Sequence, residues 1–368
     1  MRRYSDLVSI GARSVGNLTS NVSSDANDSS LIRLDSNENP FGPSPRAIET
    51  MRIAAASAHA YPDDHCIELR RKLANRHQVA VDQVLVTPGS SGMLSLLCQT
   101  LLGPGLNAVT SERSFILYSM VARAAGGRLI EAPMRGDAFS VDGILRAINS
   151  DTRLVLVANP NNPTGTMIDD GGVQEILRRV PDHVVVVLDE AYYEFTASFA
   201  RMRNAAYSNS LGHVRDSANV VVLRTFSKVH GLAGMRIGYG MGPADLLRYC
   251  AGMANTYSVG SLAQAAAMAA MDDEEHIRRT VINNSEQASV LESALREFGF
   301  RAVPTSANFV YCDLGREAAE FAGRMREQGV SVRPLGTWGA PNCIRVTIGT
   351  PEQNRKFLEA AAAIASTQ

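Results

Sequence analysis

The sequence predicts an α/β fold with a mostly parallel central sheet. Short, continuous apolar runs at residues 154–157, 184–188 and 220–223 alternate with helix-like stretches. Strands that are buried on both faces of a parallel sheet have this appearance. Polar clusters directly follow each of these runs, which indicates ligand contacts at the carboxyl ends of strands. With 368 residues and 45% hydrophobic content, the chain is long enough for a large core and a smaller satellite.

The composition of the chain narrows the kinds of molecule that it is expected to bind. Lys and Arg total 36 against 37 Asp and Glu, so no excess charge favours nucleic acid or an anionic membrane. The five cysteines are widely spaced and odd in number, which fits neither a disulfide framework nor a metal site. Residues 1–10 hold no apolar stretch as long as that of a signal peptide, and no run approaches a membrane span. We therefore expect a cytoplasmic protein that acts on small molecules.

The chain opens with a segment that carries no apolar periodicity. Residues 1–33 are rich in Ser, Asn and Asp, and we interpret them as a loosely ordered N-terminal arm. Residues 34–42 read as a polar turn, and a short helix is expected from Pro45 to about Ala58. A helix-like segment beginning near residue 63 then leads into a strand at 84–87.

A small-residue turn at 88–92 follows this strand, and an apolar helical pattern begins at Met93. The first amides of a helix are unpaired and its dipole favours negative charge, so a turn of this kind can seat an anion. A glycine-rich turn by itself is equally compatible with a plain connection.

The remaining elements divide the chain into two domains. Further strands near 108–109, 129–130 and 237–239 complete a large α/β domain at residues 34–260. A long helical stretch at about 262–298 leaves it for a smaller α+β domain at residues 261–368. The elements expected in the smaller domain are strands at 307–311, 330–333 and 344–348 and helices at 316–328 and from Pro351 onward.

Three charged residues in this framework need an explanation. Asp189 follows five apolar strand residues, which is costly unless it meets a charged partner or a ligand. Strand alternation places Arg345 opposite the apolar face of residues 344–348, where it is either solvated or grips a carboxylate. Lys228 follows a hydroxyl and lies eight residues before Arg236, with glycines between them.

The residues around Lys228 are those expected for an amine nucleophile beside an anion-binding site. A lysine forms a Schiff base with an aldehyde, and burial or nearby cations lower its pKa for that task. Pyridoxal phosphate carries both an aldehyde and a phosphate. Alone, the Ser-Lys pair is better explained as a surface lysine in a glycine-rich loop, so the rest of the chain has to decide.

Four motifs follow one another along the chain. They are Asn-Pro-Asn-Asn-Pro-Thr-Gly at 159–165, Asp-Glu-Ala-Tyr-Tyr at 189–193, Thr-Phe-Ser-Lys at 225–228 and Ile-Arg-Val-Thr-Ile-Gly-Thr at 344–350. Together they closely resemble the motifs of the fold-type I pyridoxal-phosphate-dependent aminotransferases (class I/II) of the histidinol-phosphate aminotransferase type, and the resemblance runs from about Leu34 to the C-terminus. It implies transfer of an amino group between an amino acid or a histidinol phosphate-like compound and 2-oxoglutarate by a ping-pong mechanism, in a homodimer.

The resemblance also implies roles for individual residues. Lys228 would bind the cofactor and later move a proton, and Asp189 would keep the pyridine nitrogen protonated. Tyr192 would complete the catalytic set. Further cofactor contacts are implied for Ser90, Ser91, Gly92, Phe115, Asn162, Ser227 and Arg236, with Tyr61 reaching across from a second subunit.

Two arginines and an asparagine are the substrate contacts that the resemblance implies. Arg345 would clamp the substrate carboxylate, beside Asn162. Arg333 matches an arginine that helps to bind the distal phosphate of histidinol phosphate. It could equally receive a side-chain carboxylate or support the fold.

Several departures from the family pattern leave the substrate open. The turn at 90–92 lacks side-chain capping groups, His230 replaces a common aromatic residue, and residues 257–260 differ from the usual aromatic-Asn-Val-Asn. His230 is either a packing substitution or a pocket residue. The alternatives are an aromatic or specialised-metabolite aminotransferase, a pyridoxal-phosphate-dependent decarboxylase, and a non-catalytic ligand-binding domain, although no basic helix-turn-helix segment precedes Leu34.

Overall fold

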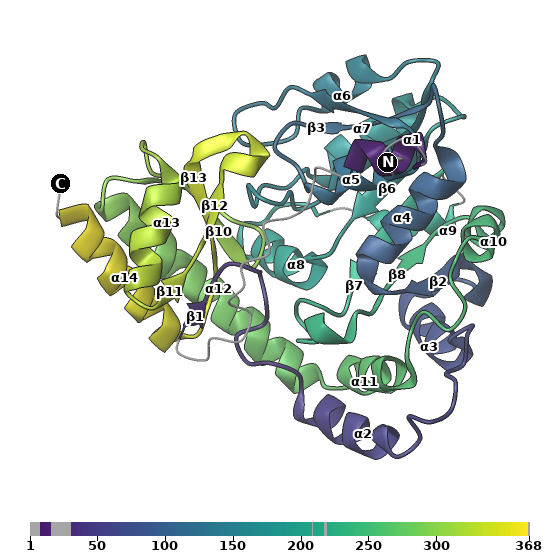
Figure 1. Cartoon of the computed structure of the whole chain (residues 1–368), viewed down its shortest axis with the longest axis horizontal. Coiled ribbons are helices and arrows are strands. Elements are labelled where there is room, and N and C mark those ends of the chain that lie inside the picture. The colour runs from purple at the N-terminus through teal and green to yellow at the C-terminus, as the bar shows by residue number, and fades with distance from the viewer. Residues whose placement is uncertain (1–7, 16–30, 208, 217–218, 367–368) are drawn as a thin grey trace, which may run out of the picture.

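The computed structural model describes residues 8–15, 31–207, 209–216 and 219–366. A seven-stranded sheet flanked by helices forms the larger part of the molecule, and a four-stranded antiparallel sheet forms the smaller part (Figure 1). The α/β class that the apolar runs predicted is confirmed.

The large sheet is mixed at one edge and parallel elsewhere. Strand β8 runs antiparallel to both of its neighbours, and the other neighbouring strands are parallel. The spatial order is β2 (Val84–Thr87), β8 (Gly238–Met241), β7 (Val220–Thr225), β6 (Val185–Asp189), β5 (Thr152–Ala158), β3 (Asn107–Ser111) and β4 (Arg128–Ala132).

The register brings three strand ends together. Asp189, the last residue of β6, lies opposite Ala158 at the end of β5 and Leu223 near the end of β7. Because these strands are parallel, the polar residues that follow them meet at one edge of the sheet.

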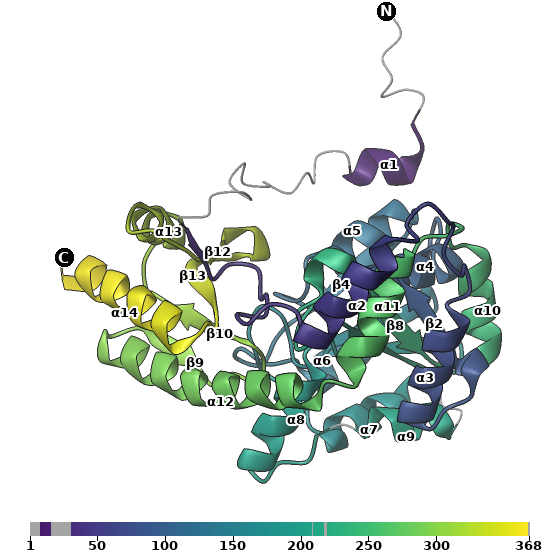
Figure 2. The same ribbon diagram turned by 90° about the horizontal axis from the view of Figure 1, so that it is seen from below.

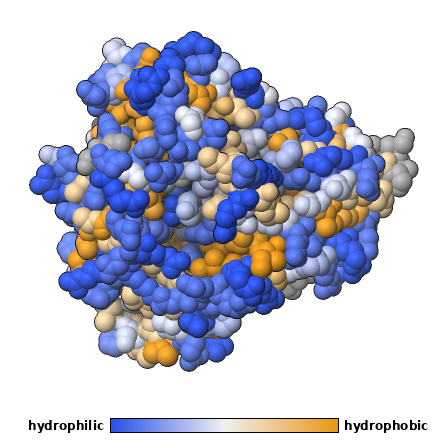
Figure 3. All heavy atoms as spheres, turned by 180° about the vertical axis from the view of Figure 1, so that it is seen from behind, coloured by the Kyte–Doolittle hydropathy of each residue, from blue (hydrophilic) through white to orange (hydrophobic). Residues whose placement is uncertain are grey.

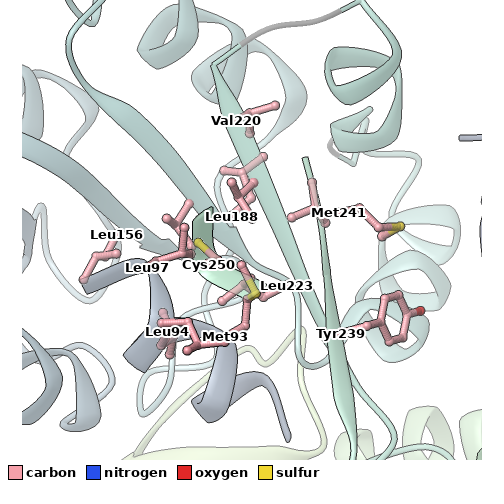
Figure 4. Close-up of a cluster of buried hydrophobic side chains, with 14 of the residues drawn as sticks. Met93, Leu94, Leu97, Leu156, Leu188, Val220, Leu223, Tyr239, Met241 and Cys250 are labelled. Atoms are coloured by element: carbon pink, nitrogen blue, oxygen red, sulfur yellow. The ribbon is translucent and has the colours of Figure 1, made fainter. Parts of the chain in front are cut away.

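Helices cover the large sheet and bury its apolar side chains. Met93 and Leu97 on helix α4 (Gly89–Leu101) point toward Leu156, Leu188 and Leu223 of the sheet (Figure 4). All five residues are fully or almost fully buried, and each such side chain contributes about 1.5–3 kcal/mol to folding. This packing explains why strands β5, β6 and β7 read as continuous apolar runs.

The other helices of the large part follow in chain order. They are α2 (Pro45–Ala55), α3 (Ile67–His77), α5 (Leu117–Ala124), α6 (Val141–Ala147), α7 (Asp170–Arg179), α8 (Tyr193–Met202), α9 (Ser210–Arg215), α10 (Ala244–Gly252) and α11 (Ser261–Met271).

The described residues of the expected loosely ordered arm include a short helix as well as strand residues 32–33. Helix α1 (Ile10–Val15) packs on α5, and a Cβ at Gly11 would lie 2.3 Å from the carbonyl oxygen of Ala124. The close approach of the two helices therefore requires a glycine at this position. Residues 1–7 and 16–30 of the predicted arm lie outside the described residues.

The helical stretch predicted at 262–298 consists of two helices. The structure has α11, which packs on α2, and a separate helix α12 (Glu274–Glu297) that runs into the smaller part (Figure 2). The side chain of Asp273 accepts a hydrogen bond from the amide of His276 at 3.3 Å and so begins the second helix. An aspartate is a preferred N-cap, and this one marks the break.

The smaller part combines C-terminal elements with a short N-terminal strand. Its sheet runs β12 (Arg333–Leu335), β13 (Ala340–Thr347), β10 (Phe309–Asp313) and β9 (Arg301–Val303), beside helices α13 (Ala318–Glu327) and α14 (Pro351–Ser366).

Strand β1 (Ile32–Arg33) pairs in parallel with β11 (Val330–Ser331), and Leu34 is buried in the apolar core of the smaller part. This pairing places residues 32–34 against the C-terminal elements. The domain boundaries at residues 34 and 260 stay predictions.

The face of the molecule in Figure 3 is mostly hydrophilic, with smaller hydrophobic patches. Among the described residues, no helix combines the length and the apolar character needed to cross a membrane.

Candidate active site

A cavity of about 430 Å³ lies where the strand ends of the large sheet face the smaller sheet. Its volume is within the range of small-molecule sites. The sequence-predicted residues that line it are Ser90, Ser91, Phe115, Asn162, Asp189, Tyr192, Ser227, Lys228, Arg236, Arg333 and Arg345.

Lys228 presents a partly buried amine to this cavity. Its Nζ donates hydrogen bonds to the carbonyl oxygens of Asn37, at 3.2 Å, and Ser36, at 3.4 Å. Burial lowers the pKa of Lys228 to about 7, and the charges of Arg345 and Arg236 act in the same direction. Near neutral pH much of this amine is therefore uncharged and able to act as a nucleophile or a base.

Asp189 supplies a buried carboxylate at the end of β6. Burial raises its pKa to about 6, although it accepts hydrogen bonds from the Tyr118 hydroxyl at 3.2 Å and from the Ala191 amide at 3.3 Å. A positive charge placed against a buried carboxylate favours its ionised form. Asp189 is therefore suited to a cationic ring nitrogen.

The start of α4 forms an anion seat. No side chain caps this helix, so its first amides, which belong to Ser90 and Ser91, remain available. A guanidinium nitrogen of Arg236 lies 3.4 Å from the Ser91 hydroxyl. A Cβ at Gly238 would lie 2.5 Å from the Ser90 nitrogen, so glycine permits the close approach of β8 to this turn.

The helix begins at Gly89, four residues before the predicted start. Gly92 consequently lies inside the first turn of α4 and does not line the cavity. A Cβ at Gly92 would lie 3.0 Å from Pro88 and 3.2 Å from Thr87. This glycine allows the helix to begin close against β2, which periodicity alone does not reveal.

A hydrogen-bonded chain connects both sides of the cavity. Arg345 donates to the Asn162 side-chain oxygen at 2.7 Å and to the Asp35 carbonyl oxygen at 2.8 Å. The Asn162 amide nitrogen donates to the Tyr192 hydroxyl at 3.4 Å, and Asn37 donates to the same hydroxyl at 2.9 Å. These bonds connect Arg345 on β13 to Asn162, which follows β5, and through Asn162 to Tyr192, which follows β6.

Arg333 and Arg345 form a cationic pair on the smaller sheet. They are direct partners across the antiparallel strands β12 and β13, and both line the cavity. Like charges directly opposite each other destabilise a sheet. An anion in the cavity offsets this repulsion, because guanidinium groups bind carboxylates and phosphates well.

Two other residues that the sequence singled out lie away from the cavity. Tyr61 is 82% exposed and stacks on Tyr257 with 4.5 Å between ring centroids, so its predicted contact with a second subunit stays a prediction. His230 is buried, and its ring lies 4.9 Å from that of Phe226. It does not line the cavity, and burial lowers its pKa to about 3. His230 is therefore a neutral packing residue in this structure.

Sequence reasoning missed several residues of the site. Ser36 and Asn37 hold Lys228 through backbone carbonyls, which leave no side-chain signal in a sequence. The polar run at 34–42 reads as an ordinary turn, yet its residues 36–38 line the cavity. Tyr118 and Trp338 come from distant elements and lie outside the four motifs of the family resemblance.

The fold and the site together define a lysine-dependent enzyme with a seat for an anionic, ring-bearing cofactor. The chain belongs to the aminotransferase class I and II family, whose model matches residues 29–360. It is a pyridoxal-phosphate-dependent aminotransferase that acts on small molecules.

Relatives of known sequence support this assignment. The chain is 39% identical to the histidinol-phosphate aminotransferase of Akkermansia muciniphila, over 90% of each protein. It is 40% identical to the histidinol-phosphate aminotransferase of Symbiobacterium thermophilum, again over 90% of each.

Solved structures show the same architecture. The histidinol-phosphate aminotransferase of Sinorhizobium meliloti in complex with pyridoxal-5'-phosphate is 25% identical, with a TM-score of 0.84 over 92% of this chain and 91% of that one. Aspartate aminotransferase of Thermus thermophilus with maleate is 26% identical, with a TM-score of 0.80 over 91% of each chain. The fold is thus shared by enzymes named for different substrates.

The cavity fits pyridoxal phosphate. The unpaired amides at the start of α4 and the Arg236 guanidinium suit the phosphate, and the buried Asp189 carboxylate suits the pyridine nitrogen. Lys228, with its lowered pKa, suits the aldehyde. No group of three His, Cys, Asp or Glu residues in the described ranges could hold a metal ion.

Proposed function

We propose that this protein transfers an amino group between a histidinol phosphate-like amino compound and 2-oxoglutarate, in a ping-pong cycle. The observation that carries the proposal is the pairing of Arg333 with Arg345 in the same cavity as Lys228. Two guanidinium groups suit a phosphate in one half-reaction and the two carboxylates of 2-oxoglutarate in the other. The names of the relatives at 39–40% identity support the same donor.

Lys228 is the proton carrier in this proposal. Bound pyridoxal phosphate supplies a carbonyl group and a ring that accepts electron density. The Nζ of Lys228 removes a proton from the substrate carbon and later returns one. Its pKa of about 7 suits both directions of transfer near neutral pH.

The surrounding residues orient the reactants. Asp189 would hold a proton on the ring nitrogen, and Phe115 would contact the ring. Asn162 and Tyr192 would hydrogen-bond the ring hydroxyl, a role that agrees with their contact to each other. Ser90, Ser91, Ser227 and Arg236 would hold the phosphate. Arg345 and Arg333 together hold the phosphate of the amino-alcohol donor, and with glutamate or 2-oxoglutarate Arg345 holds one carboxylate and Arg333 the distal one.

Assembly and location complete the proposal. We infer a homodimer, in which Tyr61 of one chain completes the phosphate seat of the other. Its exposed ring agrees with a role outside its own chain. The enzyme works in the cytoplasm, in keeping with a biosynthetic reaction on small metabolites.

A half-reaction screen tests the donor. The visible absorption of the bound cofactor is followed as single donors are added, with histidinol phosphate, glutamate and aromatic amino acids in parallel. We expect histidinol phosphate and glutamate to convert the cofactor completely, each with release of a stoichiometric oxo product. Release of carbon dioxide without an oxo product would instead identify a decarboxylase.

Arg333 offers a variant that links the screen to the site. Arg333→Gln should lower kcat/KM for histidinol phosphate by about 10- to 100-fold, because a charged hydrogen bond is lost. Arg355→Gln on the exposed face of α14 is the matched control and should leave kcat/KM unchanged. An equal response of the two variants would remove Arg333 from the proposed substrate site.

A further inference from the structure

A second cavity, of about 550 Å³, lies beside the first. The two cavities share Phe115, Ile116 and Trp338 in their linings, so these three side chains form the border between them. None of the motifs that carry the family resemblance includes Ile116 or Trp338.

Trp338 comes to this border from the smaller sheet. It ends a short 3-10 turn, Gly336–Trp338, between strands β12 and β13, the strands that carry Arg333 and Arg345. The centroid of its ring lies 6.0 Å from the guanidinium carbon of Arg345. A substrate group bound by Arg345 therefore lies close to the indole ring.

The indole is held in place by packing. Its ring packs against a small apolar cluster that includes Tyr311, Leu335 and Cys343. The indole nitrogen is buried and has no hydrogen-bond partner among the described residues. The ring therefore contributes an apolar, planar surface to the border, and not a polar anchor.

The second cavity has no net preference for charge. Its lining includes the acidic residues Glu112 and Glu131 and the basic residues Arg113 and Arg123. Charge selection thus belongs to Arg333 and Arg345, whereas the border between the cavities selects by shape and apolar contact.

We propose that Trp338 is a specificity-determining residue, and that the planar side chain of the amino donor lies against the wall formed by Trp338, Phe115 and Ile116. Planar rings gain from offset or edge-to-face packing on an indole. A compact dicarboxylic donor extends only as far as the two arginines. It therefore contacts this wall less and gains less binding energy from it. The inference rests on the proposed function and deepens it, because it names the residue against which the ring of the donor lies.

Fluorescence tests the contact without turnover. The sequence contains a single tryptophan, so all tryptophan emission of the holoenzyme comes from Trp338. The probes are 3-phenylpropionate, a ring-bearing carboxylate, and maleate, a compact dicarboxylate. We expect 3-phenylpropionate to shift and quench the emission more strongly than maleate at matched saturation, judged from cofactor absorption. Equal responses to both probes would overturn the proposal.

Variants extend the test to selectivity. Trp338→Ala should lower the ratio of kcat/KM for ring-bearing over compact donors by about 10-fold or more, mainly through KM, because apolar contact is lost. Trp338→Phe should restore most of the ratio. Tyr249→Ala, a change of an exposed ring on α10, is the control and should leave it unchanged.

Two results distinguish a failure of this inference from a failure of the proposed function. If Trp338→Ala slows both donor classes equally, Trp338 has only a structural role and the inference fails while the aminotransferase reaction stands. If the wild-type enzyme converts no donor, the proposed function fails, and the fluorescence titration still decides whether a ring binds against Trp338.

Discussion

At the scale of single residues, the chemistry depends on one amine whose charge changes near neutral pH. The pKa of Lys228 is lowered to about 7, first by burial and then by the charge of Arg345. A lysine reacts with an aldehyde only in its uncharged form. The neighbours of Lys228 thus set the pH range in which it can bind the cofactor.

This dependence predicts a pH profile for cofactor attachment. The rate at which cofactor-free protein binds pyridoxal phosphate covalently should rise with pH, with a midpoint near 7, because protonated Lys228 is unreactive. Arg345→Gln removes a nearby positive charge and should raise the pKa of Lys228, so the midpoint should move to higher pH. Stopped-flow absorbance measures both curves.

The matched control is Arg355→Gln, whose guanidinium lies on an exposed helix face. It should leave the midpoint of the profile unchanged. A midpoint for Arg345→Gln at or below that of the wild type would contradict the electrostatic argument.

The sequence identified these residues because their chemistry is out of place. A carboxylate directly after a buried strand and a lysine beside a glycine-rich turn are unusual without a ligand, so Asp189 and Lys228 could be predicted. The carbonyl oxygens of Ser36 and Asn37 could not, because backbone contacts leave no trace in side-chain identity. Tyr118 was hidden because its partner is 71 residues away.

At the scale of elements, a buried ion pair joins the ends of β6 and β7. Arg224 donates to Glu190 at 2.9 Å, both side chains are at least 95% buried, and the Arg224 guanidinium lies 3.4 Å from the centroid of the Tyr193 ring. Glu190 directly follows Asp189, and Arg224 lies four residues before Lys228. The pair therefore fixes the two strand ends that carry the chemistry.

Glu190→Gln should destabilise the protein strongly. The change leaves the Arg224 charge buried without its partner, which typically costs about 3–5 kcal/mol. The free energy of unfolding from denaturant titration measures this loss. The exposed pair of Arg355 with Glu359 is the control, and Glu359→Gln should cost no more than about 0.5 kcal/mol. Similar losses for the two variants would show that burial of the ion pair does not determine the cost.

The turn between β2 and α4 depends on a glycine in the neighbouring strand. A Cβ at Gly238 would lie 2.5 Å from the Ser90 nitrogen and 2.6 Å from the Gly89 carbonyl carbon. Gly238→Ala should push the anion seat apart, with a cost of about 1–3 kcal/mol and weaker binding of pyridoxal phosphate. Equilibrium dialysis of the cofactor checks the second effect.

Gly323→Ala in α13 provides the comparison, because no atom lies within 4 Å of a Cβ placed there. An alanine inside a helix is more favourable than a glycine by about 1 kcal/mol, so this variant should be more stable and bind the cofactor normally. Unchanged cofactor affinity in Gly238→Ala would show that the turn tolerates displacement.

Element boundaries were harder to predict than element types. The strands were recognised because their apolar runs end at polar clusters, and the structure places those clusters together. The early start of α4 and the break between α11 and α12 depend on tertiary contacts and a capping aspartate. Periodicity carries no signal for either feature.

At the scale of the whole molecule, the cavity is assembled from distant parts of the chain. The turn at 34–42 and the strands β12 and β13 lie at opposite ends of the sequence, yet both line it. The parallel pairing of β1 with β11 ties those ends together. A sequence pattern gives no measure of such long-range pairing, so only the family resemblance predicted that Arg345 would lie near Lys228.

The exposed aromatic pair of Tyr61 and Tyr257 bears on assembly. A stacked pair with one ring 82% exposed is suited to contact with a second copy. We predict a particle of twice the chain mass by sedimentation equilibrium. We also predict that Tyr61→Phe weakens cofactor binding without changing that mass, because only a hydroxyl contact is lost. A monomeric wild-type enzyme would contradict the first expectation, and full cofactor affinity in Tyr61→Phe would contradict the second.

Covalent trapping shows whether Lys228 is the lysine that binds the cofactor. Wild-type protein with pyridoxal phosphate is reduced with borohydride, digested and mapped by mass spectrometry, beside Lys228→Ala. In the wild type, we predict one cofactor-labelled peptide, which contains Lys228. In Lys228→Ala, we predict no specific label and no turnover at the wild-type rate. Label on another lysine, or turnover of Lys228→Ala at the wild-type rate, would contradict the assignment of Lys228.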